Sequence, residues 1–342
     1  MGVSMNLIFT GGGTGGHLVI ALSLAEAAKA RGHRVLFVGS TSGQDRQWFG
    51  ESTLFEETHF LETTGVVNKK GFGKLGALWK ILKAVVTSKE LIQEFQADAV
   101  VSVGGFSAAP AAIAALITKT PLYIHEQNAV TGKLNRLLRP YAKGFYSSYE
   151  EGKNHCDYPV NERYFQNARI RDAIKTVIFL GGSQGARFIN DLALEIAPWL
   201  DHGMIKIIHQ CGIKEEERVR AEYHALGINA EVYGFTTQIV ELIGRSDFAI
   251  SRSGASTLWE LCASKVPAFY IPYPSAAGDH QYHNARYIID HDAGWCERQK
   301  DGLVRKLQEA INSDIRPKSE RLGDLIHPNG AESIIRKIEE RI

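Results

Sequence analysis

A glycine-rich segment near the N-terminus ends in a histidine, and this pairing is the first sign of chemistry in the chain. Residues 11–17 read Gly-Gly-Gly-Thr-Gly-Gly-His, after a short apolar run and before a helical pattern. Glycines let backbone amides approach an anion, and a helix N-terminus adds partial positive charge. That charge also disfavours an imidazolium, so His17 is suited to act as a neutral general base. The alternative is a polar residue that caps the helix.

The same segment fits the G-x-G-x-x-G pattern of dinucleotide-binding folds. A nicotinamide site also needs a carboxylate at the end of the second strand, to bind the ribose hydroxyls. Residues 38–41 read Val-Gly-Ser-Thr and supply none. The Gly-Lys-Ser/Thr of a P-loop is missing as well. We therefore expect no cofactor.

The cysteines and histidines also lack the spacing that is typical of metal sites. The 4 cysteines are widely spread with no Cys-x-x-Cys pair. His280 and His283 are three residues apart, but no third ligand accompanies them. The sequence therefore predicts no metal site and reduced thiols rather than a disulfide framework.

A second segment suited to phosphate binding lies in the C-terminal half. Residues 251–260 read Ser-Arg-Ser-Gly-Ala-Ser-Thr-Leu-Trp-Glu, after an apolar run and into a helix. Amides and hydroxyls between Ser253 and Thr257 would face a diphosphate. Glu260 follows one turn later, where it could accept two hydrogen bonds from a ribose diol or simply compensate the helix dipole. Gln281 belongs to a later polar cluster that suits sugar hydroxyls.

Short apolar runs alternate with helical patterns and place these segments at strand ends. Helices are expected at 18–30 and 187–200, each after the first strand of its half. The alternation predicts parallel sheets with right-handed crossovers, and glycine turns at 11–16, 104–105 and 181–185. The expected strands are 6–9, 34–38, 100–103, 122–125, 176–180, 205–209, 230–233, 248–251 and 268–271.

Length and composition favour two globular domains. The chain has 342 residues, 44% hydrophobic and 23% charged, with a formal net charge of +1. These values exclude intrinsic disorder and give no global case for nucleic-acid binding. The polar stretch 157–169 marks a boundary, with domains at 1–160 and 161–328. A final amphipathic helix at about 329–342 could pack on either domain, including back onto the first.

Taken together, these segments resemble the MurG family of bacterial transferases, over nearly the whole chain and in the family's order. Single motifs of the set also occur in other two-domain glycosyltransferases, whereas the ordered set is specific. The residues that carry the resemblance are Gly12-Gly13-Thr14-Gly15-Gly16-His17, Gly104-Gly105-Phe106, His125-Glu126-Gln127-Asn128, Gly181-Gly182-Ser183-Gln184-Gly185-Ala186, Arg252-Ser253-Gly254-Ala255 with Glu260, and Gln281 with Asn284-Ala285.

The resemblance implies a GT-B fold, which is α/β: two Rossmann-like doubly wound domains with the active site in the cleft between them. It implies a metal-independent, inverting transfer of N-acetylglucosamine (GlcNAc) from UDP-GlcNAc to the muramyl 4-hydroxyl of lipid I. Lipid I is undecaprenyl-pyrophosphoryl-MurNAc-pentapeptide, and the product is lipid II for peptidoglycan synthesis. The alternatives are another GT-B enzyme such as a diacylglycerol glycosyltransferase, a UDP-GlcNAc 2-epimerase, or a non-catalytic nucleotide-sugar sensor.

The resemblance also implies roles for individual residues. His17 is its candidate base, and Gly104 and Gly105 form an acceptor loop. In the first, acceptor-facing domain, Asn128 with Thr14, Gly15 and Gly16 would reach a diphosphate. In the second domain, Glu260 would take the ribose hydroxyls and Gln281 the GlcNAc hydroxyls. The other donor-binding residues it implies are Ser183, Thr236 beside the uracil, Ala255, Ser256, Thr257, Leu258 and Trp259.

Two positions depart from the family's pattern. The family's Asn-Pro-Val-Arg is Tyr-Pro-Val-Asn over residues 158–161, so Asn161 replaces an arginine expected near the donor. Arg163, two residues on, is the candidate to substitute for it. Ile20 replaces a proline shortly after the glycine-rich histidine, which would alter only the entry into the helix.

Residues 66–89 give an independent indication of the acceptor. They contain six lysines, no acidic residue, and apolar side chains at helical spacing. Such a helix suits an anionic membrane surface, here the cytoplasmic face of the bacterial plasma membrane, with peripheral attachment. The alternative is a domain helix with a core-facing apolar side and solvated lysines; a lipid-linked acceptor favours the membrane. The predicted patch is Phe72, Lys74, Leu75, Leu78, Trp79, Leu82 and Lys83.

Overall fold

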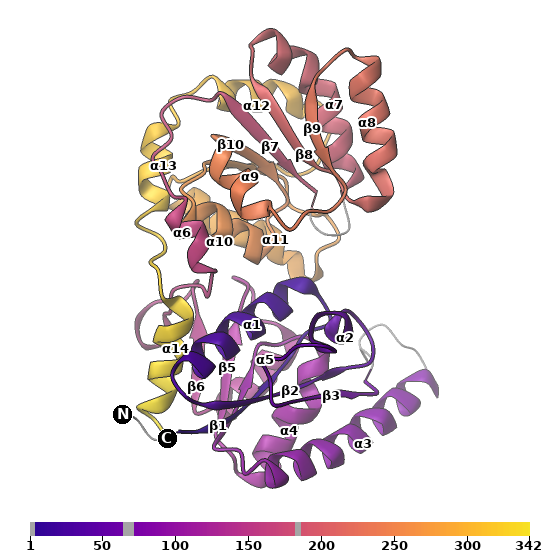
Figure 1. Cartoon of the computed structure of the whole chain (residues 1–342), viewed down its shortest axis with the longest axis vertical. Helices are drawn as coiled ribbons and strands as arrows, with labels where there is room; N and C mark the ends of the chain where they lie inside the picture. The colour runs from indigo at the N-terminus through magenta and orange to yellow at the C-terminus, as the bar shows by residue number, and fades with distance from the viewer. Residues whose placement is uncertain (1–3, 64–71, 182–185) are drawn as a thin grey trace. The chain divides into compact units, whose positions relative to one another are not determined.

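The computed structural model describes residues 4–63, 72–181 and 186–342. The chain divides into two compact units, Met1–Pro159 with Asn329–Ile342, and Val160–Pro328. The division at Pro159 lies next to the boundary expected from the sequence, and the last helix belongs to the first unit. Each unit is an α/β layer structure, with strands in a central sheet and helices on its faces (Figure 1).

The first unit is built on a parallel six-stranded sheet with the order β3-β2-β1-β4-β5-β6. One part of its core lies between the sheet and the helices α3 and α4, and the small buried alanines of α4 let that helix approach the strands closely. The elements are β1 (Asn6–Thr10), α1 (Gly15–Ala30), β2 (Arg34–Ser40), α2 (Asp45–Phe49), β3 (Glu57–Leu61), α3 (Phe72–Glu94), β4 (Ala99–Ser102), α4 (Ala109–Thr118), β5 (Leu122–Glu126), α5 (Lys133–Leu138), β6 (Gly144–Ser147) and α14 (Gly330–Glu339).

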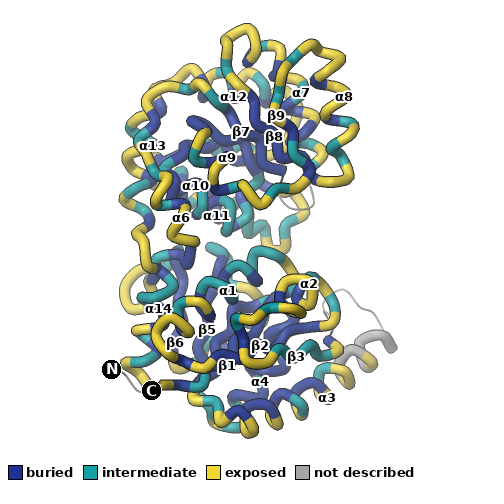
Figure 2. Tube along the Cα trace, in the orientation of Figure 1, coloured by how far each residue is buried: buried dark blue, intermediate teal, exposed yellow. Residues whose placement is uncertain are grey.

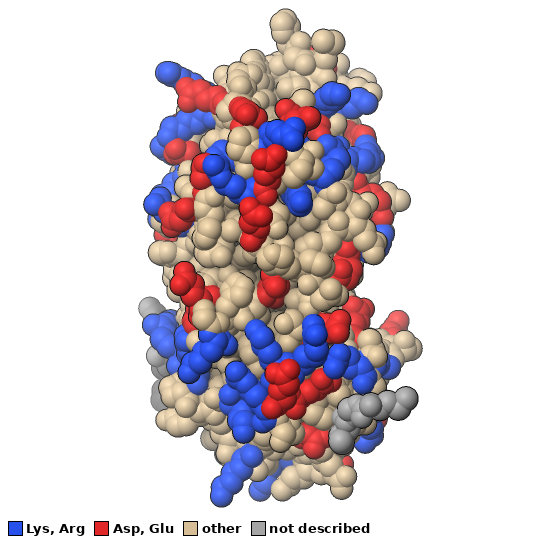
Figure 3. All heavy atoms as spheres, turned by 90° about the vertical axis from the view of Figure 1, so that its left-hand side faces the viewer, with Lys and Arg blue, Asp and Glu red and all other residues tan. Residues whose placement is uncertain are grey.

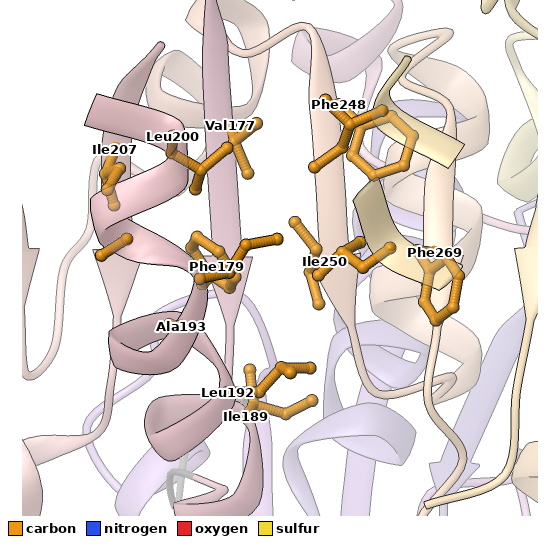
Figure 4. Close-up of a cluster of buried hydrophobic side chains, with 14 of the residues drawn as sticks. Val177, Phe179, Ile189, Leu192, Ala193, Leu200, Ile207, Phe248, Ile250 and Phe269 are labelled. Atoms are coloured by element: carbon orange, nitrogen blue, oxygen red, sulfur yellow. The ribbon is translucent and has the colours of Figure 1, made fainter. Parts of the chain in front are cut away.

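The second unit repeats this plan with the order β12-β11-β10-β7-β8-β9. Figure 4 shows side chains of α7 packed on β7, β8 and β10 in its core. The elements are α6 (Glu162–Gln166), β7 (Thr176–Leu180), α7 (Arg187–His202), β8 (Lys206–Gln210), α8 (Glu216–Ala225), β9 (Ala230–Tyr233), α9 (Ile239–Arg245), β10 (Phe248–Ser251), α10 (Ala255–Ala263), β11 (Ala268–Tyr270), α11 (His280–Asp290), β12 (Trp295–Cys296), α12 (Leu303–Ile311) and α13 (Arg316–Leu322).

The predicted parallel α/β class is confirmed, and every predicted strand is present to within two residues. The central strands are buried in both units (Figure 2), which explains their continuous apolar runs. Three strands at sheet edges were not predicted. β3 is largely polar and only partly buried, β6 begins with a glycine, and β12 has only 2 residues.

The C-terminal helix α14 packs on α1 in the first unit. Ile334, Ile335 and Ile338 are fully buried on its inner face. Glu339 accepts two hydrogen bonds from Arg31, at 2.8 and 2.7 Å, and one from Nε2 of His33 at 2.6 Å. Figure 3 shows basic and acidic side chains interspersed over this face. Apolar burial supplies most of the docking free energy, since the Arg31–Glu339 pair is partly exposed to solvent and such pairs contribute little.

The helix α3 has two sides with different surroundings. On one side, Val85, Leu91 and Ile92 are buried in the core. On the other side, Trp79, Leu82 and Val86 are 70%, 51% and 58% exposed. Their spacing of three and four residues places these three on one side of the helix. The helix therefore has the core-facing apolar side of the second interpretation and, in addition, an exposed apolar side.

The structure describes only part of the predicted membrane patch. Lys83 is exposed, whereas the side chains of Phe72, Lys74, Leu75 and Leu78 lie outside the described part of the structure. Among the described residues, no helix combines the length and the apolar character needed to cross a bilayer.

The docking of α14 yields a stability prediction. Ile335→Ala removes a buried side chain and should lower the free energy of unfolding by about 2–5 kcal/mol. Ile342→Ala is the matched control because Ile342 is 52% exposed, and it should change stability by less than about 0.5 kcal/mol. Urea unfolding followed by circular dichroism measures both. Equal effects of the two variants would contradict the packing described here.

Candidate active site

Two glycine turns pack against each other where β1 and β4 end. Gly12 N–H donates to the carbonyl of Gly104 at 3.2 Å. Gly105 has φ +82°, and a Cβ there would lie 2.3 Å from the carbonyl oxygen of Gly12. Only glycine satisfies both conditions. The pair β1/β4 is also the point where the strand order reverses, which is where doubly wound sheets bind their ligands.

A buried carboxylate holds the first turn in place. Asp45, at the start of α2, is fully buried and accepts hydrogen bonds from Gly13 N–H at 2.5 Å and Ser40 N–H at 2.8 Å. Asp45 could not be predicted from the usual ribose-binding position, because it lies at the start of α2 and not at the end of β2. Since both oxygens of Asp45 bind backbone amides of the turns, the carboxylate supports the turn rather than binding a ribose.

His17 occupies the first turn of α1, which begins at Gly15 after Thr14. Its Nδ1 lies 3.0 Å from Thr14 Oγ1, and its Nε2 lies 2.9 Å from the amide nitrogen of Gln127. An amide nitrogen can only donate, so Nε2 of His17 accepts and Nδ1 carries the proton toward Thr14. The ring is thereby held as a neutral imidazole with its lone pair directed toward Gln127.

His125 and Glu126 support the neighbouring loop from β5. Burial, and secondarily the nearby His17, lowers the pKa of His125 to about 3, so this ring adds no positive charge. Glu126 accepts from the N–H of Asn128 at 3.0 Å, the N–H of Gly132 at 2.9 Å and the side chain of Asn135 at 2.8 Å. The predicted residue Asn128 is therefore placed by a carboxylate that fixes the whole loop.

The second unit contains two adjoining pockets at its own reversal of strand order, β7/β10. A pocket of about 200 Å³ is lined by Gln210, Phe235, Thr236 and Glu260. A pocket of about 730 Å³ is lined by Arg252, Tyr273 and Gln281 among others. Leu180 and Thr257 line both. Of the residues predicted for the donor, Thr236 and Glu260 thus line the smaller pocket, Gln281 lines the larger one, and Thr257 lines both.

The start of α10 provides backbone donors beside these pockets. Its N-cap residue Gly254 makes no side-chain cap hydrogen bond, and helix N-termini are sites where backbone amides can bind an anion. Leu258 and Trp259 are fully buried and Ala255 is nearly so, while Ser256 is partly exposed. The side chains of Leu258 and Trp259 therefore lie in the core and not toward a ligand, and the N–H of Leu258 already donates to the Gly254 carbonyl at 3.0 Å.

Glu260 faces the smaller pocket from α10. Burial raises the pKa of this carboxyl to about 7, and a hydrogen bond with Tyr164 acts in the opposite direction. The same burial raises the pKa of the Tyr164 phenol well above its usual range. Tyr164 therefore remains the donor of this bond, and the ionised carboxylate keeps further acceptor capacity for a ligand.

Gln281 and Arg252 line the larger pocket. Gln281 Oε1 accepts from Tyr273 N–H at 2.9 Å, which leaves its amide nitrogen as a donor. Arg252 donates to the carbonyls of Ile271 and Pro272, at 2.9 and 3.2 Å, and burial lowers the pKa of its guanidinium. A donor amide and a fixed cation suit a sugar linked to a diphosphate.

The departure at residue 161 has a local structural role. Asn161 caps α6, because its Oδ1 accepts from Arg163 N–H at 3.0 Å. Arg163 is the residue expected to substitute for the family's arginine, and its guanidinium forms a 2.6 Å ion pair with Glu241 on α9.

Ser183, which the resemblance implies in donor binding, lies outside the described residues. Within the described ranges, no cluster of three or more His, Cys, Asp or Glu side chains is arranged to hold a metal ion.

Comparison with known proteins agrees with this architecture. Residues 7–147 match the glycosyltransferase family 28 N-terminal domain, and residues 176–340 match the family 28 C-terminal domain. The fold is similar to the crystal structure of Acinetobacter baumannii MurG, with a TM-score of 0.81 at 23% identity, over 98% of this chain and 99% of that one. The chain is thus a two-domain glycosyltransferase of the GT-B class.

Curated relatives narrow the family further. A Sulfurimonas denitrificans protein is 52% identical over 93% of this chain and 94% of its own length, and a Campylobacter hominis protein is 49% identical over 99% and 98%. Both are named UDP-N-acetylglucosamine--N-acetylmuramyl-(pentapeptide) pyrophosphoryl-undecaprenol N-acetylglucosamine transferase. The chain belongs to this family, the MurG family.

The role of Asp45 can be tested by an isosteric change. Asp45→Asn replaces one acceptor oxygen with an amide that cannot accept from a backbone N–H, and should cost roughly 1–3 kcal/mol of stability. Since a small shift of a catalytic group has a large effect, transferase kcat/KM should fall roughly ten- to hundredfold. Asp191→Asn, on an exposed carboxylate paired with Arg218, is the matched control. Wild-type kinetics in Asp45→Asn would show that the turn does not need this carboxylate.

Proposed function

We propose that this protein transfers GlcNAc from UDP-GlcNAc to the 4-hydroxyl of the muramyl residue of lipid I, forming lipid II. The observation that carries the proposal is the gathering of Thr236, Thr257, Glu260 and Gln281 on two joined pockets at the start of α10. The near full-length similarity to the named relatives supports the same substrates. Nothing in the described residues favours an epimerase, a diacylglycerol transferase or a sensor over this activity.

The donor lies along the two pockets in this proposal. The uracil meets the backbone near Thr236, and the ribose diol donates to Glu260 in the smaller pocket. The diphosphate accepts from backbone amides at the start of α10, and the resemblance adds Ser183, which lies outside the described residues. The GlcNAc hydroxyls bind Gln281 in the larger pocket. Arg163 is paired with Glu241, and the proposal gives it no contact with the donor.

The chemical step is an in-line displacement at the anomeric carbon. The muramyl 4-hydroxyl oxygen forms the new bond to C1 while the bond from C1 to the phosphate oxygen breaks, and its electron pair leaves with UDP. The hydroxyl proton passes to Nε2 of His17. For this to happen the hydroxyl replaces the Gln127 amide, which occupies that position at 2.9 Å. Attack opposite the leaving group converts the α linkage to β.

Charge on the departing diphosphate is stabilised by groups that are already oriented. Helix N-termini and backbone amides supply partial positive charge without the need to reorganise during the reaction. Asn128, Thr14, Gly15 and Gly16 from the first unit, with the acceptor loop Gly104–Gly105, complete the binding of the two diphosphates. Because these groups perform the electrostatic task, the reaction requires neither metal nor cofactor.

The lipid-linked acceptor is reached from the membrane surface. Trp79, Leu82 and Val86 form the exposed apolar side of α3, with Lys80 and Lys83 beside them. Aromatic and aliphatic side chains insert into the interfacial region while lysines attract anionic headgroups. In this proposal the protein attaches peripherally to the cytoplasmic face of the plasma membrane, and nucleic acid is not a partner.

Replacement of the base separates binding from chemistry. His17→Ala should lower kcat roughly 10²–10⁴-fold, because general base catalysis contributes that much, while UDP-GlcNAc affinity stays near wild type. The assay uses labelled UDP-GlcNAc and a soluble lipid I analogue, with EDTA present throughout. His59→Ala is the matched control, since His59 pairs with Glu57 on β3 away from the turns. A fully active His17→Ala enzyme would exclude His17 as the base.

The membrane surface is tested by a double substitution. Trp79→Ser with Leu82→Ser should weaken binding to phosphatidylglycerol-containing vesicles roughly tenfold or more, because burial of such side chains contributes about 1.5–3 kcal/mol each. Ile213→Ser, on an apolar residue of the second unit that is 69% exposed, is the control. Sedimentation with vesicles measures binding. Unchanged sedimentation of the double variant would remove this part of α3 from the membrane contact.

A further inference from the structure

We propose that Gln127 acts as a gate on the base: without acceptor it occupies His17, and in this way it suppresses hydrolysis of the donor by water. This role rests on the proposed function, in which His17 takes the proton of the attacking hydroxyl. It adds to that reaction a means of discriminating between the acceptor hydroxyl and water. Gln127 is a positioning residue in this scheme, because it acts through His17 and not on the reacting atoms.

The contact between the two side chains is direct. The amide nitrogen of Gln127 lies 2.9 Å from Nε2 of His17, and Nδ1 of the same ring lies 3.0 Å from Thr14 Oγ1. The Cδ2 edge of the ring lies beside Gly104, where a Cβ would be 3.6 Å from Cδ2. A neutral imidazole has one acceptor nitrogen. A water molecule can therefore donate to Nε2 only after the Gln127 amide has moved.

The backbone that carries Gln127 is fixed. Gln127 directly follows β5, whose last residue is Glu126. The Glu126 carboxylate accepts from the backbone N–H of Asn128 at 3.0 Å and from that of Gly132 at 2.9 Å. These bonds hold the chain on both sides of Gln127. Rotation about the side-chain torsions of Gln127 is therefore the motion that can move its amide away from the base.

The closed position of Gln127 depends on one side-chain hydrogen bond within the described part of the chain, the bond to His17. Gln127 is 7% exposed, and its Oε1 is buried without a hydrogen-bond partner among the described residues. A buried carbonyl oxygen without a partner destabilises the arrangement that contains it. Rotation of the side chain breaks the bond from nitrogen and loses none at the oxygen. Opening the gate therefore costs about one hydrogen bond.

Water would follow the same chemical route as the acceptor if the base were open to it. The water oxygen would bond to C1 of GlcNAc while the bond from C1 to the phosphate oxygen breaks, and the electron pair of that bond would leave with UDP. One water proton would pass to Nε2 of His17, and the other would stay on the new hydroxyl. The products would be free GlcNAc and UDP. Occupation of the base by Gln127 therefore protects the donor.

The acceptor differs from water in what else it binds. In the proposed site its diphosphate reaches the turn at residues 14–16 and Asn128, which is the neighbour of Gln127 in the chain. Binding energy from these remote contacts offsets the loss of the bond between Gln127 and His17, and a water molecule has no such contacts. The acceptor hydroxyl thus displaces the amide, whereas water does not.

The test compares hydrolysis with transfer. Labelled UDP-GlcNAc is incubated without acceptor and free GlcNAc is measured, and parallel reactions contain the soluble lipid I analogue. Gln127→Ala should hydrolyse the donor roughly three- to tenfold faster than wild type, because water no longer has to displace a hydrogen bond to the base. Damage to the fold would lower this rate and not raise it. Gln93→Ala, on an exposed glutamine near the end of α3, is the matched control and should leave hydrolysis unchanged.

A double variant shows whether the added hydrolysis uses the base. His17→Ala combined with Gln127→Ala should return hydrolysis to the wild-type rate or below. Faster hydrolysis by Gln127→Ala that is lost in the double variant supports the gate. Hydrolysis by Gln127→Ala at the wild-type rate, or added hydrolysis that survives in the double variant, would overturn the gate and leave transfer by the wild-type protein standing. Absence of wild-type transfer to the lipid I analogue would overturn the proposed function and the gate with it.

A second variant covers the case in which Gln127→Ala is poorly folded in thermal unfolding. Gln127→Asn keeps the amide but is one methylene shorter, so that its nitrogen no longer reaches Nε2 of His17. It should also hydrolyse the donor faster than wild type. An unchanged rate of hydrolysis in folded Gln127→Asn would count against the gate in the same way.

Discussion

Both units depend on one constraint of doubly wound sheets: where the strand order reverses, two strands send their chains to opposite faces and leave space at their carboxyl ends. In the first unit this point lies between β1 and β4, and in the second between β10 and β7. At each point a helix begins without a side-chain cap, after Thr14 and after Gly254. The uncapped amides there are what a diphosphate requires.

The two reversal points are used differently. In the first unit the glycine turns pack so closely that Gly105 would clash with Gly12 if it carried a Cβ, and Asp45 takes one of the turn's amides. These turns are tightly packed, and His17 is held in a defined orientation by Thr14 and Gln127. In the second unit the side chains of Thr257, Glu260 and Gln281 line two pockets. A base needs orientation, whereas a large ligand needs room.

Much of this arrangement could be predicted from the sequence, since buried parallel strands leave continuous apolar runs and glycine turns mark their ends. His17, Thr257, Glu260 and Gln281 follow from motifs that lie directly on those turns. Asp45, Tyr164 and the contact of Gln127 with His17 could not be found in this way. Each acts on a site residue far away in the chain, and contacts of that kind leave no periodic signal. Leu258 and Trp259 lie inside a binding motif, yet helix geometry turns their side chains into the core.

The central claim is that the donor pockets and the base serve one reaction, the conversion of lipid I to lipid II. The most direct measurement is incubation of the wild-type protein with UDP-[¹³C]GlcNAc and a soluble lipid I analogue in EDTA, with the linkage of the product determined by NMR. We expect transfer without added metal and a β-linked GlcNAc on the muramyl 4-oxygen. An α-linked product, or donor binding with no transfer to the lipid I analogue, would contradict the account.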